Sequence, residues 1–149
     1  GWCYRRRTGN KQVTMIQKIE HIGIAVTDLD AAIEMYKALG LELVGEETVE
    51  DQKVRTAFFK IGESCFELLE ATDPTSPIAR YIEKNAGRGG IQHIAMAVDD
   101  VDAEIERLKG EGFQMIDESA RDGAHGNRIA FLHPKSTDGT LLEVCAKAG

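Results

Sequence analysis

One pattern of apolar and polar positions occurs twice along the chain, and the two copies align without a gap. Residues 19–34 recur as residues 91–106, so that His21 in the first copy corresponds to His93 in the second. Each copy opens with a short apolar run, passes through a group of aspartates and then places apolar residues at helical spacing. The pattern predicts a strand, an aspartate N-cap and a helix in each copy.

Each predicted helix ends at a glycine and is followed by three further strand-like runs. In the first copy the glycine is Gly40, and the runs cover residues 41–46, 54–61 and 65–71. In the second copy the glycine is Gly112, and the runs cover residues 113–118, 128–133 and 140–146. Each copy therefore has the order βαβββ, and a further helix is expected between the copies at 78–85.

Alternation within the first strand of each copy separates two faces. His21 and His93 lie on one face, followed there by small residues, which is typical of a strand that lines a hollow. A single strand histidine is most often structural, but a pseudo-twofold axis would bring two equivalent histidines together. The other face is expected to pack beneath the helices and carries Ile22, Ile24, Val26, Ile94, Met96 and Val98.

The last strand of each copy carries a carboxylate among apolar neighbours, Glu67 in the first and Glu143 in the second. A buried carboxylate needs a cation, strong hydrogen bonds or a proton. Together with His21 and His93, these residues offer a ligand set that suits a divalent transition metal with open positions for water or substrate. In the alternative, both glutamates face solvent, since a slip of one residue in register would turn each side chain away.

The chain has three cysteines, which are too scattered for a disulfide framework and are typical of a reducing cytoplasm. Cys65 and Cys145 share the strand parity of the glutamates and are either further ligands or small apolar packing residues. Cys3 belongs to residues 1–14, an arginine-containing segment without regular patterning that is expected to be an extension outside the core.

Composition limits the size and the partners of the protein. The chain has 149 residues, 42% of them hydrophobic, which is enough for a single domain over residues 15–149. Its modules are expected at about 15–72 and 90–149, with a linker at 73–89. The formal net charge of −7 disfavours nucleic acid as a partner. No apolar run of about 18 residues occurs, so no contact with a membrane is expected.

The paired modules with His21, Glu67, His93 and Glu143 resemble the vicinal-oxygen-chelate superfamily, which includes glyoxalase I, extradiol dioxygenases, antibiotic-resistance proteins and methylmalonyl-CoA epimerases. Residues 20–26, 87–95 and above all 123–136 (GAHGNRIAFLHPKS) are most similar to the epimerases. The resemblance implies an α+β fold in which two βαβββ modules form an eight-stranded curled mixed sheet around a metal-binding cup. It also implies a homodimer and an acyl-CoA substrate.

The resemblance further implies metal-dependent epimerisation of methylmalonyl-CoA through a metal-stabilised enolate. One divalent ion, whether cobalt, zinc, manganese, nickel or magnesium, would be held by His21, Glu67, His93 and Glu143. Glu143 matches the glutamate that both binds the metal and transfers a proton. Residues 123–126 are expected to form a mobile loop beside the cavity.

The second acid/base is less directly implied. Some relatives carry a glutamate on the third strand of the first module, but residues 55–58 (RTAF) contain none. We therefore expect Glu67 in this role, with a metal-bound water, Glu50 or Asp51 as alternatives.

Two other functions stay open for the same fold. A glyoxalase I-like lactoylglutathione lyase would use similar metal chemistry on a glutathione hemithioacetal. A non-catalytic antibiotic-binding resistance protein would use the same cup without needing four ligands. An extradiol dioxygenase is less favoured, because it would use two histidines and one carboxylate and leave a fourth ligand without a purpose.

Overall fold

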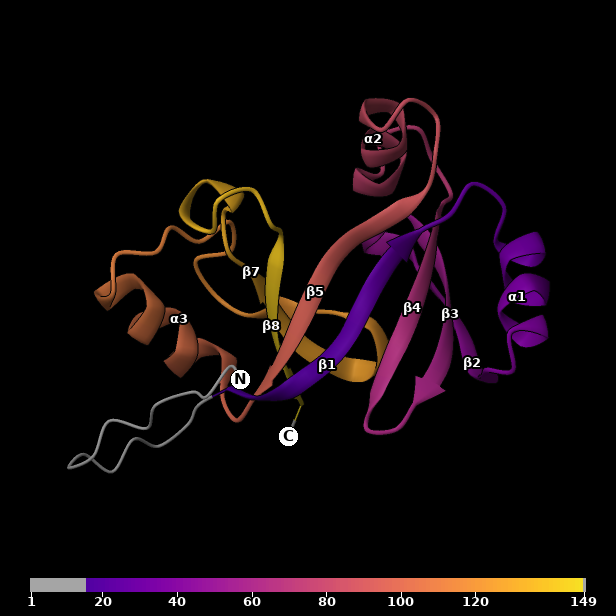
Figure 1. The fold of residues 1–149 in the computed structure, drawn as a ribbon. Coiled ribbons are helices and arrows are strands. Elements are labelled where there is room, and N and C mark those ends of the chain that lie inside the picture. The colour runs from indigo at the N-terminus through magenta and orange to yellow at the C-terminus, as the bar shows by residue number, and fades with distance from the viewer. Residues whose placement is uncertain (1–15, 149) are drawn as a thin grey trace, which may run out of the picture.

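The computed structural model describes residues 16–148 (Figure 1). The extension predicted at residues 1–14, with Cys3, lies outside the described residues. The first module consists of β1 (Ile16–Ala25), α1 (Leu29–Ala38), β2 (Glu42–Val49), β3 (Val54–Ile61) and β4 (Ser64–Ala71). The linker carries α2 (Pro77–Lys84). The second module consists of β5 (Gly90–Val98), α3 (Val101–Gly110), β6 (Arg121–Asp122), β7 (Asn127–Phe131) and β8 (Leu142–Lys147).

The strands form one mixed sheet of eight, in the order β2-β3-β4-β1-β5-β8-β7-β6. Strands β1 and β4 are parallel, as are β5 and β8. Strands β1 and β5 run antiparallel in the middle of the sheet and join the two modules. Figure 1 shows these two strands side by side at the centre, with α1 beyond one module and α3 beyond the other. The predicted α+β fold, with paired modules and an eight-stranded curled mixed sheet, is confirmed.

Helices α1 and α3 begin and end in matching ways, as the repeat predicts. Asp28 and Asp100 are the N-caps, and each side chain accepts a hydrogen bond of 3.1 Å from the backbone N–H three residues later. Gly40 and Gly112 follow the helices with φ of +102° and +96°, a conformation that glycine adopts without steric cost. The duplicated aspartates and glycines therefore set where both helices start and stop.

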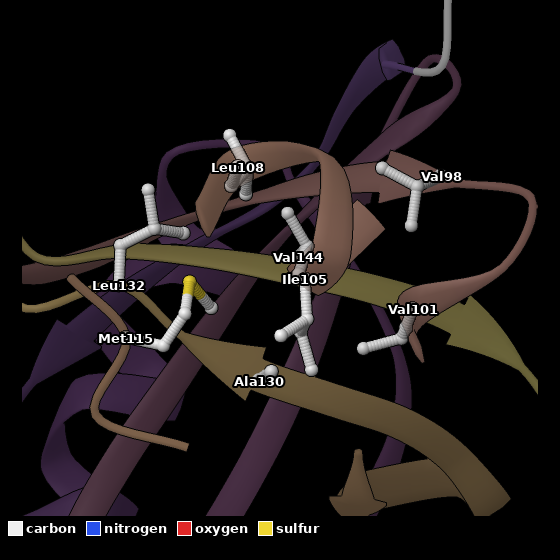
Figure 2. Packing of buried hydrophobic residues seen from close by; sticks show 8 residues of the cluster. All are labelled: Val98, Val101, Ile105, Leu108, Met115, Ala130, Leu132 and Val144. Atoms are coloured by element: carbon white, nitrogen blue, oxygen red, sulfur yellow. The ribbon is translucent and has the colours of Figure 1, made fainter. Parts of the chain in front are cut away.

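Each module buries the helix-facing side of its strands in a hydrophobic cluster of its own. In the first module, residues of α1 pack against Phe59 and Leu68 from β3 and β4. Figure 2 shows the cluster of the second module, in which α3 packs over the sheet, and its members are Val98, Val101, Ile105, Leu108, Met115, Ala130, Leu132 and Val144. His21 and His93 have the opposite strand parity, so they project to the face that these helices leave uncovered.

The outer strand of the second module is much shorter than predicted. Residues 113–118 form no strand, and only the two residues of β6 pair with the outer edge of β7. An isolated bridge joins Met115 to Leu132. Beyond it, the Asp117 side chain accepts the Phe131 N–H at 2.8 Å, so a carboxylate takes the place of a strand carbonyl and the ladder stops.

The linker helix α2 forms close to its predicted position. Ser76 is its N-cap, and Pro77 occupies the first turn, where its missing N–H is not needed. Among the helices described between residues 16 and 148, none combines the length and the apolar character needed to cross a bilayer.

Replacing Leu68 by alanine should lower the free energy of unfolding by about 2–5 kcal/mol, because it removes a fully buried side chain from the first cluster. Urea unfolding followed by circular dichroism measures this loss. Leu39→Ala is the matched control, since Leu39 is 68% exposed and its truncation should cost less than about 0.5 kcal/mol. Equal losses in the two variants would contradict the assignment of this core.

Candidate metal centre

The two repeated histidines meet at the antiparallel seam between β1 and β5. In this ladder His21 lies opposite Ala95 and His93 lies opposite Gly23, so the imidazoles leave the same face at neighbouring positions. Their Nε2 atoms are 3.0 Å apart, and the rings are nearly perpendicular, with centroids 5.1 Å apart. Both residues are buried. The duplication therefore brings two imidazole nitrogens to one point.

The parallel ladders add one carboxylate from each module. On β4, Glu67 lies opposite Gly23, two positions after His21. On β8, Glu143 lies opposite Ala95, two positions after His93. Glu67 Oε1 is 3.6 Å from His21 Nε2 and 3.7 Å from His93 Nε2. The two Glu143 oxygens lie 3.5 and 3.7 Å from the same nitrogens. Both carboxylates are buried, so the alternative in which they face solvent is wrong.

The residue just before each histidine holds the other ring nitrogen. The Glu20 carboxylate accepts a hydrogen bond from His21 Nδ1, and Gln92 Oε1 accepts one of 2.5 Å from His93 Nδ1. Carboxylate and amide oxygens only accept, so each Nδ1 carries a hydrogen, and in a neutral imidazole each Nε2 then presents a lone pair. Two such lone pairs repel each other at 3.0 Å unless a cation or a proton lies between them.

These groups fit a divalent metal ion. His21, His93 and Glu143 offer ligand atoms that all lie within 4.8 Å of one another. Glu143 Oε2 is buried and has no hydrogen-bond partner among residues 16–148, and a cation would supply the partner that this oxygen lacks. Glu67 reaches both imidazoles but lies outside this compact group. The structure thus brings three of the four predicted ligands into a triad, with the fourth beside it.

Burial and mutual charge decide where protons sit in the metal-free site. Burial opposes charge on His21, but the Glu20 hydrogen bond and the carboxylates of Glu67 and Glu143 outweigh it and raise its pKa to about 9. Burial, and then the charge on His21, lowers the pKa of His93 to about 3. Burial raises the pKa of Glu143 to about 8 and also raises that of Glu67. At neutral pH, His21 and Glu143 therefore carry protons that a metal would displace.

A cavity of about 360 Å³ opens onto the four groups, within the size range of small-molecule sites. Thr56 and Phe58 of β3 and Ile129 and Phe131 of β7 contribute to its wall, so both modules build it. The 123–126 loop lies beside it as expected, with His125 in the wall.

The two described cysteines also line this cavity, but they do not belong to the compact ligand group found among residues 16–148. Burial raises the pKa of the thiols of Cys65 and Cys145. A thiol kept neutral is a poor metal ligand, which favours the packing role for both.

Pattern analysis missed two charged residues near the site, Glu47 on β2 and Arg121 on β6. Glu47 lies opposite Thr56, a residue of the cavity wall, and accepts a hydrogen bond of 3.0 Å from the His125 backbone N–H. Arg121 lines the cavity itself. Neither residue has a counterpart in the other copy of the repeat, and only the strand registers reveal their positions.

Comparison with known proteins places the chain in one superfamily. Residues 20–131 match the model of the Glyoxalase/Bleomycin resistance protein/Dioxygenase superfamily, and the chain belongs to that superfamily.

Within this class the chain is similar to methylmalonyl-CoA epimerases, as the sequence motifs predict. The ethylmalonyl-CoA/methylmalonyl-CoA epimerase of Cereibacter sphaeroides is 39% identical over 87% of this chain and 98% of its own length. The methylmalonyl-CoA epimerase of Mycobacterium tuberculosis superposes with a TM-score of 0.87 at 38% identity, over 93% of each chain. A methylmalonyl-CoA epimerase in complex with methylmalonyl-CoA and NH4+ superposes with a TM-score of 0.85 at 40% identity, over 90% of this chain and 96% of that one.

Metal binding should release protons, because a cation competes with the protons that His21 and Glu143 carry at neutral pH. From about pH 6 to pH 8, Co²⁺ affinity should rise by about tenfold per pH unit for each proton displaced. Calorimetric titration in buffers of different ionisation enthalpy counts these protons. Binding that neither releases protons nor depends on pH would contradict the protonation states assigned to the two groups.

Gly23→Ala should displace the His93 ring, because a Cβ at Gly23 would lie 2.1 to 2.7 Å from three of its ring atoms. We expect Co²⁺ affinity to fall by about 10- to 100-fold while the far-ultraviolet circular dichroism spectrum is retained. Gly110→Ala is the control, since a Cβ there meets nothing within 4 Å. Wild-type Co²⁺ affinity in the Gly23 variant would place the His93 ring outside the metal centre.

Proposed function

We propose that this protein is an enzyme that epimerises methylmalonyl-CoA with the help of one divalent metal ion. The observation that carries the proposal is the convergence of His21, His93, Glu67 and Glu143 on one point of a cavity. Similarity to methylmalonyl-CoA epimerases over most of the chain supports the substrate class.

His21, His93 and Glu143 would hold the metal, with Glu67 as a fourth ligand. When bound, the ion supplies Lewis-acid stabilisation of negative charge on a nearby oxygen. Glu20 and Gln92 accept hydrogen bonds from the Nδ1–H groups of the two histidines. These bonds keep both Nε2 lone pairs directed into the site. The protein's part is therefore to orient these ligands and to place acid/base groups around the reacting carbon.

Glu143 is the first of these acid/base groups in our proposal. It would remove the proton from the carbon between the thioester and the free carboxylate of methylmalonyl-CoA. Burial raises its pKa to about 8 in the metal-free protein. The proton that Glu143 carries in that state would be displaced by a bound cation. The carboxylate that results could accept a proton from the substrate and return it.

Inversion of the carbon needs a second group that acts on the opposite face. We assign this role to Glu67, because it comes from the other module and lies at matching distances from the two imidazoles. Glu47 is an alternative that the tertiary structure adds, since its half-buried carboxylate stands near the cavity wall and is held by His125. Of the alternatives in the preceding loop, Asp51 lines the cavity.

The two other functions of this fold predict different assay results. A glyoxalase I-like lyase would convert the glutathione hemithioacetal and leave methylmalonyl-CoA unchanged. An antibiotic-binding protein would bind a drug without metal and without turnover. Similarity to epimerases across both modules favours epimerisation of methylmalonyl-CoA over these two functions.

Metal-loaded protein should interconvert the two epimers of methylmalonyl-CoA and exchange the reacting proton for deuterium in D₂O. Glu143→Gln should slow this exchange by at least about 100-fold, because an amide cannot take up the proton, and Glu67→Gln should slow epimerisation by a similar factor. Mass spectrometry follows the exchange, and a chiral assay follows the epimerisation.

Glu106→Gln is the matched control, because Glu106 is an exposed glutamate on α3 outside the cavity. Wild-type rates in both site variants would remove the two carboxylates from the reaction. Loss of epimerisation in Glu47→Gln with retention in Glu67→Gln would move the second role to Glu47. Conversion of the hemithioacetal without any exchange in methylmalonyl-CoA would establish the lyase instead.

A further inference from the structure

One cation in the wall of the cavity has no part in the chemistry above. Among the described residues that line the cavity, Arg121 alone carries a permanent positive charge. The same wall holds four acidic side chains, those of Glu20, Asp51, Glu67 and Glu143. A permanent positive charge in this wall favours an anionic substrate group, because it offsets the repulsion from those acidic side chains that are ionised.

Fixed contacts direct the Arg121 side chain toward the cavity. Strand β6 pairs Arg121 with Ile129, another residue of the cavity wall, so both side chains leave the same face of the sheet. Arg121 Nε donates a hydrogen bond of 2.9 Å to Asp117, and the guanidinium lies 5.6 Å from the centroid of the Phe131 ring. The other Asp117 oxygen accepts the Phe131 N–H. The guanidinium is therefore held in place without a ligand.

The Phe131 ring also connects this guanidinium to the metal-binding residues. Phe131 packs edge-on against His93, with centroids 5.5 Å apart, and lies opposite Glu143 across β7 and β8. Arg121 donates a hydrogen bond from Nε to Asp117, whereas its two terminal nitrogens donate no hydrogen bond to any residue between 16 and 148. A planar pair of free donors suits a carboxylate, which it can bind through two parallel hydrogen bonds.

We propose that Arg121 binds the free carboxylate of the acyl group and so selects carboxyacyl-CoA thioesters over acyl-CoA thioesters that lack this carboxylate. The inference rests on the proposed function, because it assigns substrate recognition within the same cavity. Arg121 is thus a specificity residue, separate from the groups that bind metal or transfer protons.

Arg128 provides a matched comparison from the same segment. Its side chain is 41% exposed, as is that of Arg121, but its guanidinium donates to Asp122 and to the Ala120 carbonyl at 2.7 Å each. It does not line the cavity. Removing the charge of Arg128 therefore changes the net charge of the protein by the same amount as removing that of Arg121, but leaves the proposed carboxylate site intact.

The test measures binding of malonyl-CoA and propionyl-CoA to the Co²⁺-loaded protein, since these ligands differ at the position of the carboxylate. The wild type should prefer malonyl-CoA, and Arg121→Gln should reduce this preference by about 10- to 100-fold. Propionyl-CoA binding and Co²⁺ affinity should stay unchanged. Arg121→Lys keeps the charge but loses the planar fork, so it should restore only part of the preference. Arg128→Gln should match the wild type.

The outcomes separate this inference from the proposed function. A full preference for malonyl-CoA in Arg121→Gln, or an equal loss for both ligands, would overturn the role of Arg121 even if the wild type epimerises methylmalonyl-CoA. A selective loss in Arg121→Gln would support that role even if the wild type exchanged no proton. In an active enzyme, the same variant should raise KM for methylmalonyl-CoA more than it lowers kcat.

Discussion

The site depends on an electrostatic requirement at the seam between β1 and β5. Two imidazole nitrogens 3.0 Å apart and two buried carboxylates face one point. Without a cation or protons at that point, this arrangement would destabilise the folded protein. The β1–β5 ladder that joins the modules also brings the two histidines together, and the parallel ladders within each module add the two carboxylates. Side chains on such central strands are held more precisely than side chains on loops, which is what a metal centre needs.

The two modules supply matching candidate ligands but surround them with different side chains. An anion, Glu20, holds the ring of His21, whereas a neutral amide, Gln92, holds the ring of His93. Arg121, the permanent cation of the described cavity wall, comes from the second module. A methylmalonyl thioester is itself unsymmetrical, with a neutral thioester on one side of the reacting carbon and a carboxylate on the other. An unsymmetrical charge distribution around a nearly symmetrical set of ligands suits that substrate.

The candidate ligand residues could be predicted because each residue type occurs twice at equivalent positions, and a duplicated histidine or strand carboxylate is rarely accidental. Glu47 and Arg121 occur once, so the repeat carries no signal for them, and their places follow from pairing with Thr56 and Ile129. The prediction of a strand at 113–118 is wrong because a tertiary contact, which the local pattern does not carry, ends the pairing there. Its apolar pattern is typical of a strand, but the Asp117 carboxylate takes the N–H of a residue far along the chain and ends the ladder.

The sequence by itself determined two βαβββ modules, the ends of their helices and the residue types of the site. These features depend on local periodicity, aspartate caps and glycine conformations, all of which act within a few residues. Only the tertiary structure decided that His21 and His93 meet, that Glu143 completes the compact triad while Glu67 lies beside it, and that Arg121 lines the cavity. Those outcomes depend on register between strands far apart in the chain, where a slip of one residue would turn every side chain to the other face.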